Sequence, residues 1–66
     1  MKIILNGKNT EVHDSLSLHQ LLLNMKITPE LVACELNFKI IRRKDYSQTH
    51  LQEGDQLEIL QMIGGG

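Results

Sequence analysis

The sequence predicts an α+β fold, in which a mixed sheet of four to five strands is covered on one face by one main helix. Three observations lead to this prediction. An early β-branched segment runs into an Asn-Gly pair, one segment shows the 3.6-residue period of an amphipathic helix, and a late apolar segment alternates as a strand does. With 66 residues, the chain is expected to form one domain, residues 1–63, followed by a flexible glycine tail, residues 64–66.

The first predicted element is a β-hairpin. Residues 2–5 read Lys-Ile-Ile-Leu and lead into Asn6-Gly7. Asparagine and glycine both accept the positive φ angles of a tight two-residue turn. The return strand is expected from Lys8 to His13, where Thr10 and Val12 alternate with polar neighbours.

The second predicted element is the helix, and its start is the clearest local signal. Ser17 is a suitable N-cap and Gln20 follows three residues later, which is the spacing of a capping box. Leu16 and Leu21 are placed to form a hydrophobic staple across this start. The apolar face of the helix is predicted to contain Leu18, Leu21, Leu22 and Met25. Because Pro29 cannot continue a helix, the end is expected near Lys26 or Ile27.

The remaining segments predict strands joined by turns. In order, they are a strand over residues 31–36, a turn at Asn37-Phe38, a short strand over 39–41, an irregular crossing over 42–50, a turn over 53–55 and a final strand over 56–63. The predicted core contains Ile3, Leu5, Leu18, Leu21, Leu22, Met25, Val32, Cys34, Leu36, Leu57 and Ile59.

Composition argues against several functional classes. The net charge is -1 and there is no long basic run, which disfavours nucleic-acid binding. The apolar segments are too short for a membrane span or a signal peptide, so we expect a cytoplasmic protein. A chain of this size buries only about 60% of its unfolded surface, which leaves little room for a deep catalytic pocket. Together with the lack of a catalytic motif, this predicts a protein that is not an enzyme.

The sequence also predicts no metal site. Cys34 is the only cysteine, and its place in an alternating strand favours a buried core thiol. His13, His19 and His50 lie on separate predicted elements without ligand spacing. The basic run over residues 42–44 is typical of a solvated loop.

The candidate chemical group is the carboxyl terminus. Gly64, Gly65 and Gly66 offer no side chains for packing, but a glycine tail can thread into a narrow channel of another protein. Reaction of the Gly66 carboxylate with the α-phosphate of ATP would give a mixed anhydride that a sulfur nucleophile can open to a thiocarboxylate. A frayed terminus without function is the alternative reading of the tail alone.

Residues beside the tail are candidate partner contacts. Alternation along the final strand sends Leu57 and Ile59 inward and leaves Leu60 and Met62 on the solvent side. Single exposed apolar side chains are ordinary, but an apolar group that leads to a reactive end suits docking. The predicted partner-binding residues are Leu60, Met62, Ile63 and Gly64.

Several segments carry a resemblance to a known family. They are Leu5-Asn6-Gly7, Ser17-Leu18-His19-Gln20-Leu21-Leu22, Glu35-Leu36-Asn37, Ile40-Ile41, the stretch from Arg43 to Tyr46, Glu53-Gly54-Asp55 and Gln61-Met62-Ile63-Gly64-Gly65-Gly66. In these segments and over nearly its whole length, the sequence resembles the ThiS family of sulfur carriers. It differs at Phe38, where the family often has glycine, and at Arg42, where proline is common.

The resemblance implies a fold, a chemistry and a set of partners. The implied fold is the β-grasp, or ubiquitin-like, roll. The implied chemistry is adenylation of Gly66 and its conversion to a thiocarboxylate, with Gly65 as the neighbour needed for threading. The implied partners are a ThiF-like activating enzyme that uses ATP, a sulfur donor such as a cysteine desulfurase, and a ThiG-like thiazole synthase. No cofactor is expected on the chain itself.

Two alternatives remain open at this point. A small subunit of molybdopterin synthase is also a β-grasp protein with a terminal Gly-Gly, although such subunits tend to be longer. A non-covalent β-grasp interaction module could carry a glycine tail that has no chemical role.

Overall fold

A computed structural model describes residues 1–62 of the chain. The elements in order are β1 (Lys2–Leu5), β2 (Lys8–Glu11), α1 (Leu18–Asn24), the 3-10 helix η1 (Pro29–Leu31), β3 (Val32–Leu36), β4 (Lys39–Ile41), the 3-10 helix η2 (Arg43–Gln48) and β5 (Gln56–Gln61). The strands form one sheet in the order β2-β1-β5-β3-β4. Only β1 and β5 are parallel, so the sheet is mixed and the predicted α+β class is confirmed.

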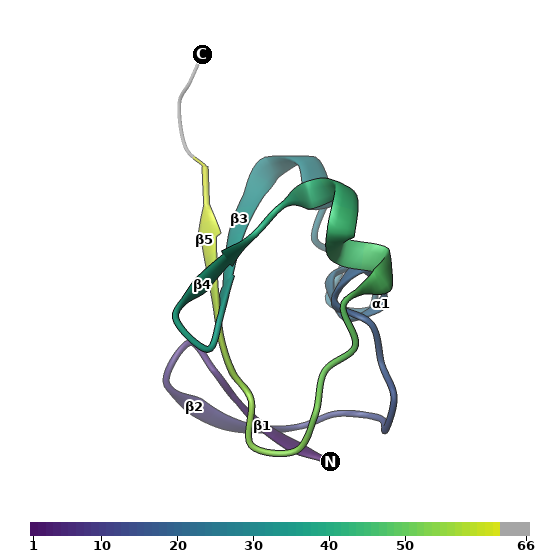
Figure 1. The fold of residues 1–66 in the computed structure, drawn as a ribbon, viewed down its shortest axis with the longest axis vertical. Coiled ribbons are helices and arrows are strands. Elements are labelled where there is room, and N and C mark those ends of the chain that lie inside the picture. The colour runs from purple at the N-terminus through teal and green to yellow at the C-terminus, as the bar shows by residue number, and fades with distance from the viewer. Residues whose placement is uncertain (63–66) are drawn as a thin grey trace.

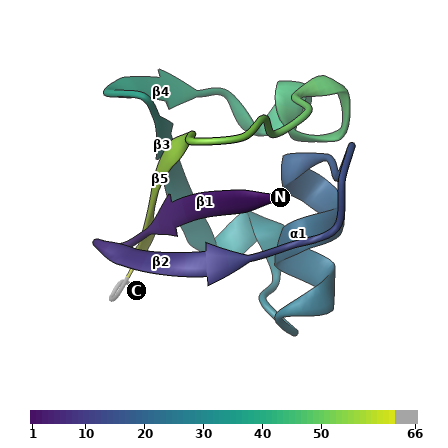
Figure 2. The ribbon, with the colours of Figure 1, turned by 90° about the horizontal axis from the view of Figure 1, so that it is seen from below.

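The domain has two layers, with the sheet on one side and α1 and η2 on the other (Figures 1 and 2). Between the layers lie the buried side chains of Ile3, Leu18, Leu21, Leu22, Val32, Cys34, Tyr46, Leu51 and Leu57. The opposite face of the sheet is not covered by any described element (Figure 2). One face of β1, β3 and β5 therefore packs on the core, and the other faces outward.

The start of α1 forms the predicted capping box. The Ser17 hydroxyl accepts a hydrogen bond from the Gln20 N–H at 3.0 Å, and the Gln20 side-chain oxygen accepts one from the Ser17 N–H at 3.0 Å. Two donors at the helix start are thus satisfied, a stabilisation typically worth about 1 kcal/mol.

The end of α1 differs from the prediction. The helix ends at Asn24 because Lys26 takes the left-handed conformation, with φ 61. Lys26 N–H donates to the Leu23 carbonyl at 2.9 Å and Ile27 N–H donates to the Leu22 carbonyl at 2.8 Å, which is the Schellman motif. The helix therefore ends before Pro29, and Pro29 is not what ends it.

This early end explains one wrong core prediction. Met25 is the C-cap residue rather than a residue of the helix body, and its side chain is 42% exposed. The other helix residues predicted on the core face, Leu18, Leu21 and Leu22, are buried. Leu5, Leu36 and Ile59 are partly buried and pack against the core.

Four further segments differ from the sequence-based expectation. The final strand β5 ends at Gln61, and Met62 lies beyond it. The return strand β2 stops at Glu11 rather than at His13. The third strand starts at Val32, because Leu31 belongs to η1. The stretch over 42–50 is not irregular throughout, since it contains η2, which buries Tyr46 against the core. Among the described residues no helix is long and apolar enough to cross a membrane.

Candidate functional site

The candidate site begins where β5 emerges from the centre of the sheet. β1 lies on one side of β5 and β3 on the other, and β5 points away from the end of the molecule that holds the N-terminus (Figure 1). Leu57 is fully buried, while Leu60 is 60% exposed. Met62, two residues further on, is 53% exposed. The side chains of Leu60 and Met62 thus face solvent, on the side that the alternation predicts.

A third apolar side chain joins these two. Met62 N–H donates to the Leu31 carbonyl at 2.9 Å, so Leu31 lies directly opposite Met62. Leu31 is 56% exposed. Leu31, Leu60 and Met62 together form a surface that we call the outer patch. Leu31 is not among the site residues predicted from the sequence, although it shares the parity of the outward-facing Ala33 and extending the alternation by one residue pair would include it.

The outer patch is bordered by one small side chain and by two acidic side chains. Ala33 pairs with Leu60 across β3 and β5, and its small side chain leaves Leu60 prominent. Glu35 pairs with Glu58 in the next outward-facing row of the same two strands. The patch is therefore apolar at the end of β5 and bounded by two carboxylates further back along the strand.

The predicted tail lies outside the described residues. Ile63, Gly64, Gly65 and Gly66, all named as site residues from the sequence, follow Met62 directly. The structure brings Leu60 and Met62 together at the end of the described part of the chain.

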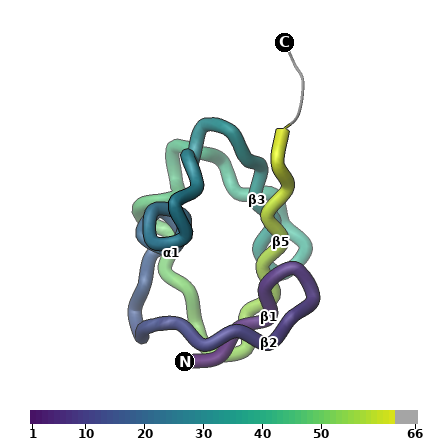
Figure 3. The backbone as a smooth tube through the Cα atoms, turned by 180° about the vertical axis from the view of Figure 1, so that it is seen from behind, coloured from purple at the N-terminus to yellow at the C-terminus, as the bar shows by residue number. Residues whose placement is uncertain are grey.

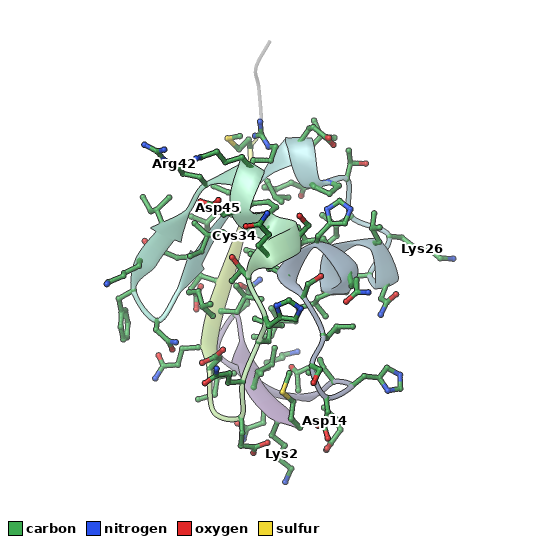
Figure 4. All side chains as sticks on the ribbon, turned by 45° about the vertical axis from the view of Figure 1, so that its right-hand side comes forward. Lys2, Asp14, Lys26, Cys34, Arg42 and Asp45 are labelled. Carbon is green, nitrogen blue, oxygen red and sulfur yellow. The ribbon has the colours of Figure 1, made fainter. Side chains whose placement is uncertain are left out.

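Cys34 does not belong to the candidate site. It is 2% exposed and lies in the interior, whereas Lys2, Lys26 and Arg42 lie on the outside (Figure 4). Burial raises the pKa of the Cys34 thiol, with a smaller opposing effect from a hydrogen bond with Tyr46. A thiol that stays protonated is a poor nucleophile, which agrees with the core role expected for it.

The other titratable groups of residues 1–62 form no metal site. No three His, Cys, Asp or Glu side chains of the described chain lie close enough together to hold a metal ion. In the basic run, the Arg43 guanidinium donates to the Glu30 carbonyl at 3.2 Å. Arg43 therefore helps to fix η2 to the segment before β3, which is a structural task.

The comparisons with known proteins agree on one family. A family model described as the ThiS family matches residues 3–66. The sulfur carrier protein ThiS of Escherichia coli is 29% identical to the chain, with each chain covered over its full length. The crystal structure of a thiamine biosynthesis protein (ThiS) from Geobacter metallireducens has a TM-score of 0.87 at 35% identity, and both chains are covered completely. The β-grasp fold implied by the resemblance is thereby confirmed.

A longer relative is also similar. A thiazole synthase of Magnetococcus marinus is 41% identical over all 66 residues of the chain. The chain spans only 20% of that protein. A segment like this chain is thus one part of a larger polypeptide in that organism.

Proposed function

Because this chain belongs to the ThiS family, we propose that it is a sulfur carrier of thiamine biosynthesis, with the Gly66 carboxylate as its working group. The observation that carries the proposal is the extent of the family match, which runs through the glycine tail to Gly66. The similarity to the E. coli carrier over the full length of both chains supports it. Both comparisons favour a thiamine carrier over a molybdopterin synthase subunit.

The proposed chemistry has two steps at the terminal carboxylate. An oxygen of the Gly66 carboxylate attacks the α-phosphorus of ATP, pyrophosphate leaves, and an acyl-adenylate forms. A hydrosulfide then attacks the acyl carbon and expels AMP; where the donor is a persulfide, the same attack gives an acyl disulfide, which a thiol reductant cleaves to the thiocarboxylate and a second disulfide. The product is a thiocarboxylate whose sulfur is passed to thiazole synthase.

The domain supplies recognition rather than catalysis in this scheme. The sole cysteine is buried, and burial raises its pKa, so Cys34 is not suited to accept sulfur. The reacting groups other than the carboxylate come from partners: a ThiF-like activating enzyme with its ATP, a sulfur donor such as a cysteine desulfurase, and a ThiG-like thiazole synthase.

The outer patch is the proposed docking surface. Leu60 and Met62 are exposed beside the point where the tail begins, and we assign them, with Ile63 and Gly64, to partner contacts. An apolar surface beside the tail would hold the domain while the glycines thread into the partner's active site. Leu31 extends this surface across the start of β3.

ATP–pyrophosphate exchange tests the first step. With the activating enzyme, labelled pyrophosphate should enter ATP only when this chain is present. A chain lacking Gly66 is the matched control, because the described domain is unaltered while the carboxylate is withdrawn by one residue. Equal exchange with the shortened chain would show that Gly66 is not the adenylated residue.

A further inference from the structure

The strand β5 extends further than β1, its neighbour on one side. β1 pairs with β5 only at Ile4 with Gln56 and Leu5 with Leu57, after which the chain turns away at Asn6. β5 continues to Gln61 (Figure 3). The far part of β5 therefore has β3 on one side and an open edge on the other.

The Asn6 side chain occupies the first position of this edge. Ile59 N–H donates to the Asn6 side-chain oxygen at 2.7 Å. The Asn6 side-chain amide donates back to the Ile59 carbonyl at 3.4 Å. The side chain thus acts as one further peptide group of β1 and satisfies the β5 backbone as far as Ile59.

Gln61 is the next residue on the open edge. In an antiparallel pair, consecutive residues point their N–H and C=O groups to opposite sides of the strand. Met62 N–H bonds to Leu31 on the β3 side, so the N–H and C=O of Gln61 point to the β1 side, beyond Asn6. Within residues 1–62 no strand pairs with Gln61 on that side, since the pairing of β1 with β5 ends at Leu57, and no turn or side-chain hydrogen bond reaches it.

A pocket opens beside this edge, between the end of α1 and the sheet. It measures about 220 Å³ and is lined by Asn6, Met25, Ile27, Val32, Ile59 and Gln61. Most of the lining is apolar. Met25, which is exposed because α1 ends early, forms part of the wall of this pocket.

We infer that the open edge of β5 receives an extended segment of thiazole synthase as an added strand, with one apolar side chain in the pocket. The N–H and C=O of Gln61 point to the same side of an extended backbone. Another extended backbone can bond to both groups at once, which favours strand addition over binding of a small molecule. Gln61 lies between Leu60 and Met62, so the added strand would continue the proposed docking surface around the edge of the sheet.

The choice of thiazole synthase rests on the proposed function and on the relative from Magnetococcus marinus. In that protein a segment similar to this whole chain occurs within a polypeptide named thiazole synthase. Two parts of one polypeptide meet at high effective concentration, which favours a contact between them.

Amide hydrogen exchange, resolved by residue in the ¹⁵N-labelled full chain, tests this inference. In the free chain, Gln61 should exchange about tenfold or more faster than Ile59 and Met62, whose N–H groups are bonded. Saturation with unlabelled thiazole synthase should slow Gln61 by about tenfold or more.

A pair of variants tests the pocket in the same titration. Met25→Ala should weaken binding of thiazole synthase by about fivefold, because it removes part of the pocket wall without touching the buried core. Ile40→Ala is the matched control, since Ile40 is an exposed aliphatic residue on β4, at the other edge of the sheet. The affinity of the Ile40→Ala variant for thiazole synthase should stay unchanged.

Two results would overturn the inference in distinguishable ways. If thiazole synthase binds but Gln61 exchange is unaltered at saturation, strand addition is wrong and the proposed function stands. If thiazole synthase does not bind the chain at all, the inference and the proposed transfer to that partner both fail.

Discussion

Asn37 and Gln56 are joined by two hydrogen bonds that tie the β3–β4 turn to the start of β5. Asn37 N–H donates to the Gln56 carbonyl at 2.7 Å, and Gln56 N–H donates to the Asn37 side-chain oxygen at 2.9 Å. The Asn37 side-chain amide also donates to Asp55 at 3.0 Å. Asn6, in the other hairpin turn, bonds to Ile59 of the same strand, so an asparagine of each turn anchors β5.

Replacement of Asn37 should therefore destabilise the domain. Asn37→Ala removes the side-chain hydrogen bonds and places alanine at φ 51, and we expect a loss of about 2 kcal/mol in the free energy of unfolding. Asn37→Gly accepts the positive φ and should lose about half as much. Urea denaturation measures both values, and an unchanged midpoint for Asn37→Ala would show that the turn does not anchor β5.

Replacement of Phe38 should have the opposite effect. Phe38 has φ 71, a conformation that costs a non-glycine residue about 1 kcal/mol or more, and its ring is 80% exposed. Phe38→Gly should raise the free energy of unfolding by about 0.5 to 1 kcal/mol. Phe38→Ala is the control, because it removes the ring but keeps the Cβ, and it should give no gain. A less stable glycine variant would mean that the ring makes a stabilising contact.

The features predicted well from the sequence are those set by near neighbours. The Asn6-Gly7 turn, the Ser17 and Gln20 capping box and the alternation along β5 each depend on residues close together in the chain. Burial of Tyr46 depends instead on η2 folding back onto the core, which no local pattern in a polar stretch reveals. The end of α1 was misjudged because it is set by Lys26 in a left-handed conformation, which lysine seldom adopts.

Within the candidate site, strand parity was sufficient to place Leu60 and Met62 on the outer face. Leu31 was not predicted as a site residue, although parity in the predicted strand over residues 31–36 places it on the same face as Ala33; in the structure Leu31 ends η1 and lies opposite Met62. The tail carries no periodic pattern at all. Its proposed role follows from the chemistry of a terminal carboxylate and from the family, not from packing.

The stability of the domain should fall in alkaline solution because of Tyr46. Its hydroxyl donates to the Val32 carbonyl at 3.4 Å, and burial, with a smaller effect from Cys34, raises the pKa of Tyr46 from 10.0 to about 12. The unfolded chain loses this proton above about pH 10 and the folded chain only near pH 12, so stability is full below pH 10 and declines between the two values.

The decline attributable to Tyr46 should reach about 2 to 3 kcal/mol. Urea midpoints measured from pH 8 to pH 12 give this slope, and Tyr46→Phe supplies the control because it keeps the ring without the ionisable group. If both proteins lose stability equally with pH, Tyr46 is not the cause.

A charge on the outer patch should impair docking without unfolding the domain. Leu60→Lys places an ammonium on the exposed face near Glu58 and Glu35, where it is electrostatically tolerated. Binding to the activating enzyme should weaken by about tenfold or more. Ile40→Lys, on β4, should bind normally. Calorimetric titration gives the affinities and circular dichroism the fold; an unfolded Leu60→Lys domain would mean that Leu60 contributes to the core.

The position of the carboxylate should matter as much as its presence. One alanine added after Gly66 moves the carboxylate by about 3.5 Å and adds a Cβ, whereas misplacement by about 1 Å can already cost a hundredfold in rate. The extended chain should keep its melting temperature and lose adenylation. One glycine added in the same place separates the effect of length from that of the methyl group. Normal adenylation of both extended chains would exclude a strict geometric requirement at the terminus.

The intact mass of the chain after sulfur transfer tests the proposed mechanism most directly. Incubation with ATP, the activating enzyme and a sulfur donor should raise the mass by about 16 Da, the difference between one sulfur and one oxygen atom. Fragmentation should assign the whole increase to Gly66, and the extended chain should show none. An unchanged mass, or an added sulfur located at Cys34, would contradict a carrier that works through its terminal carboxylate.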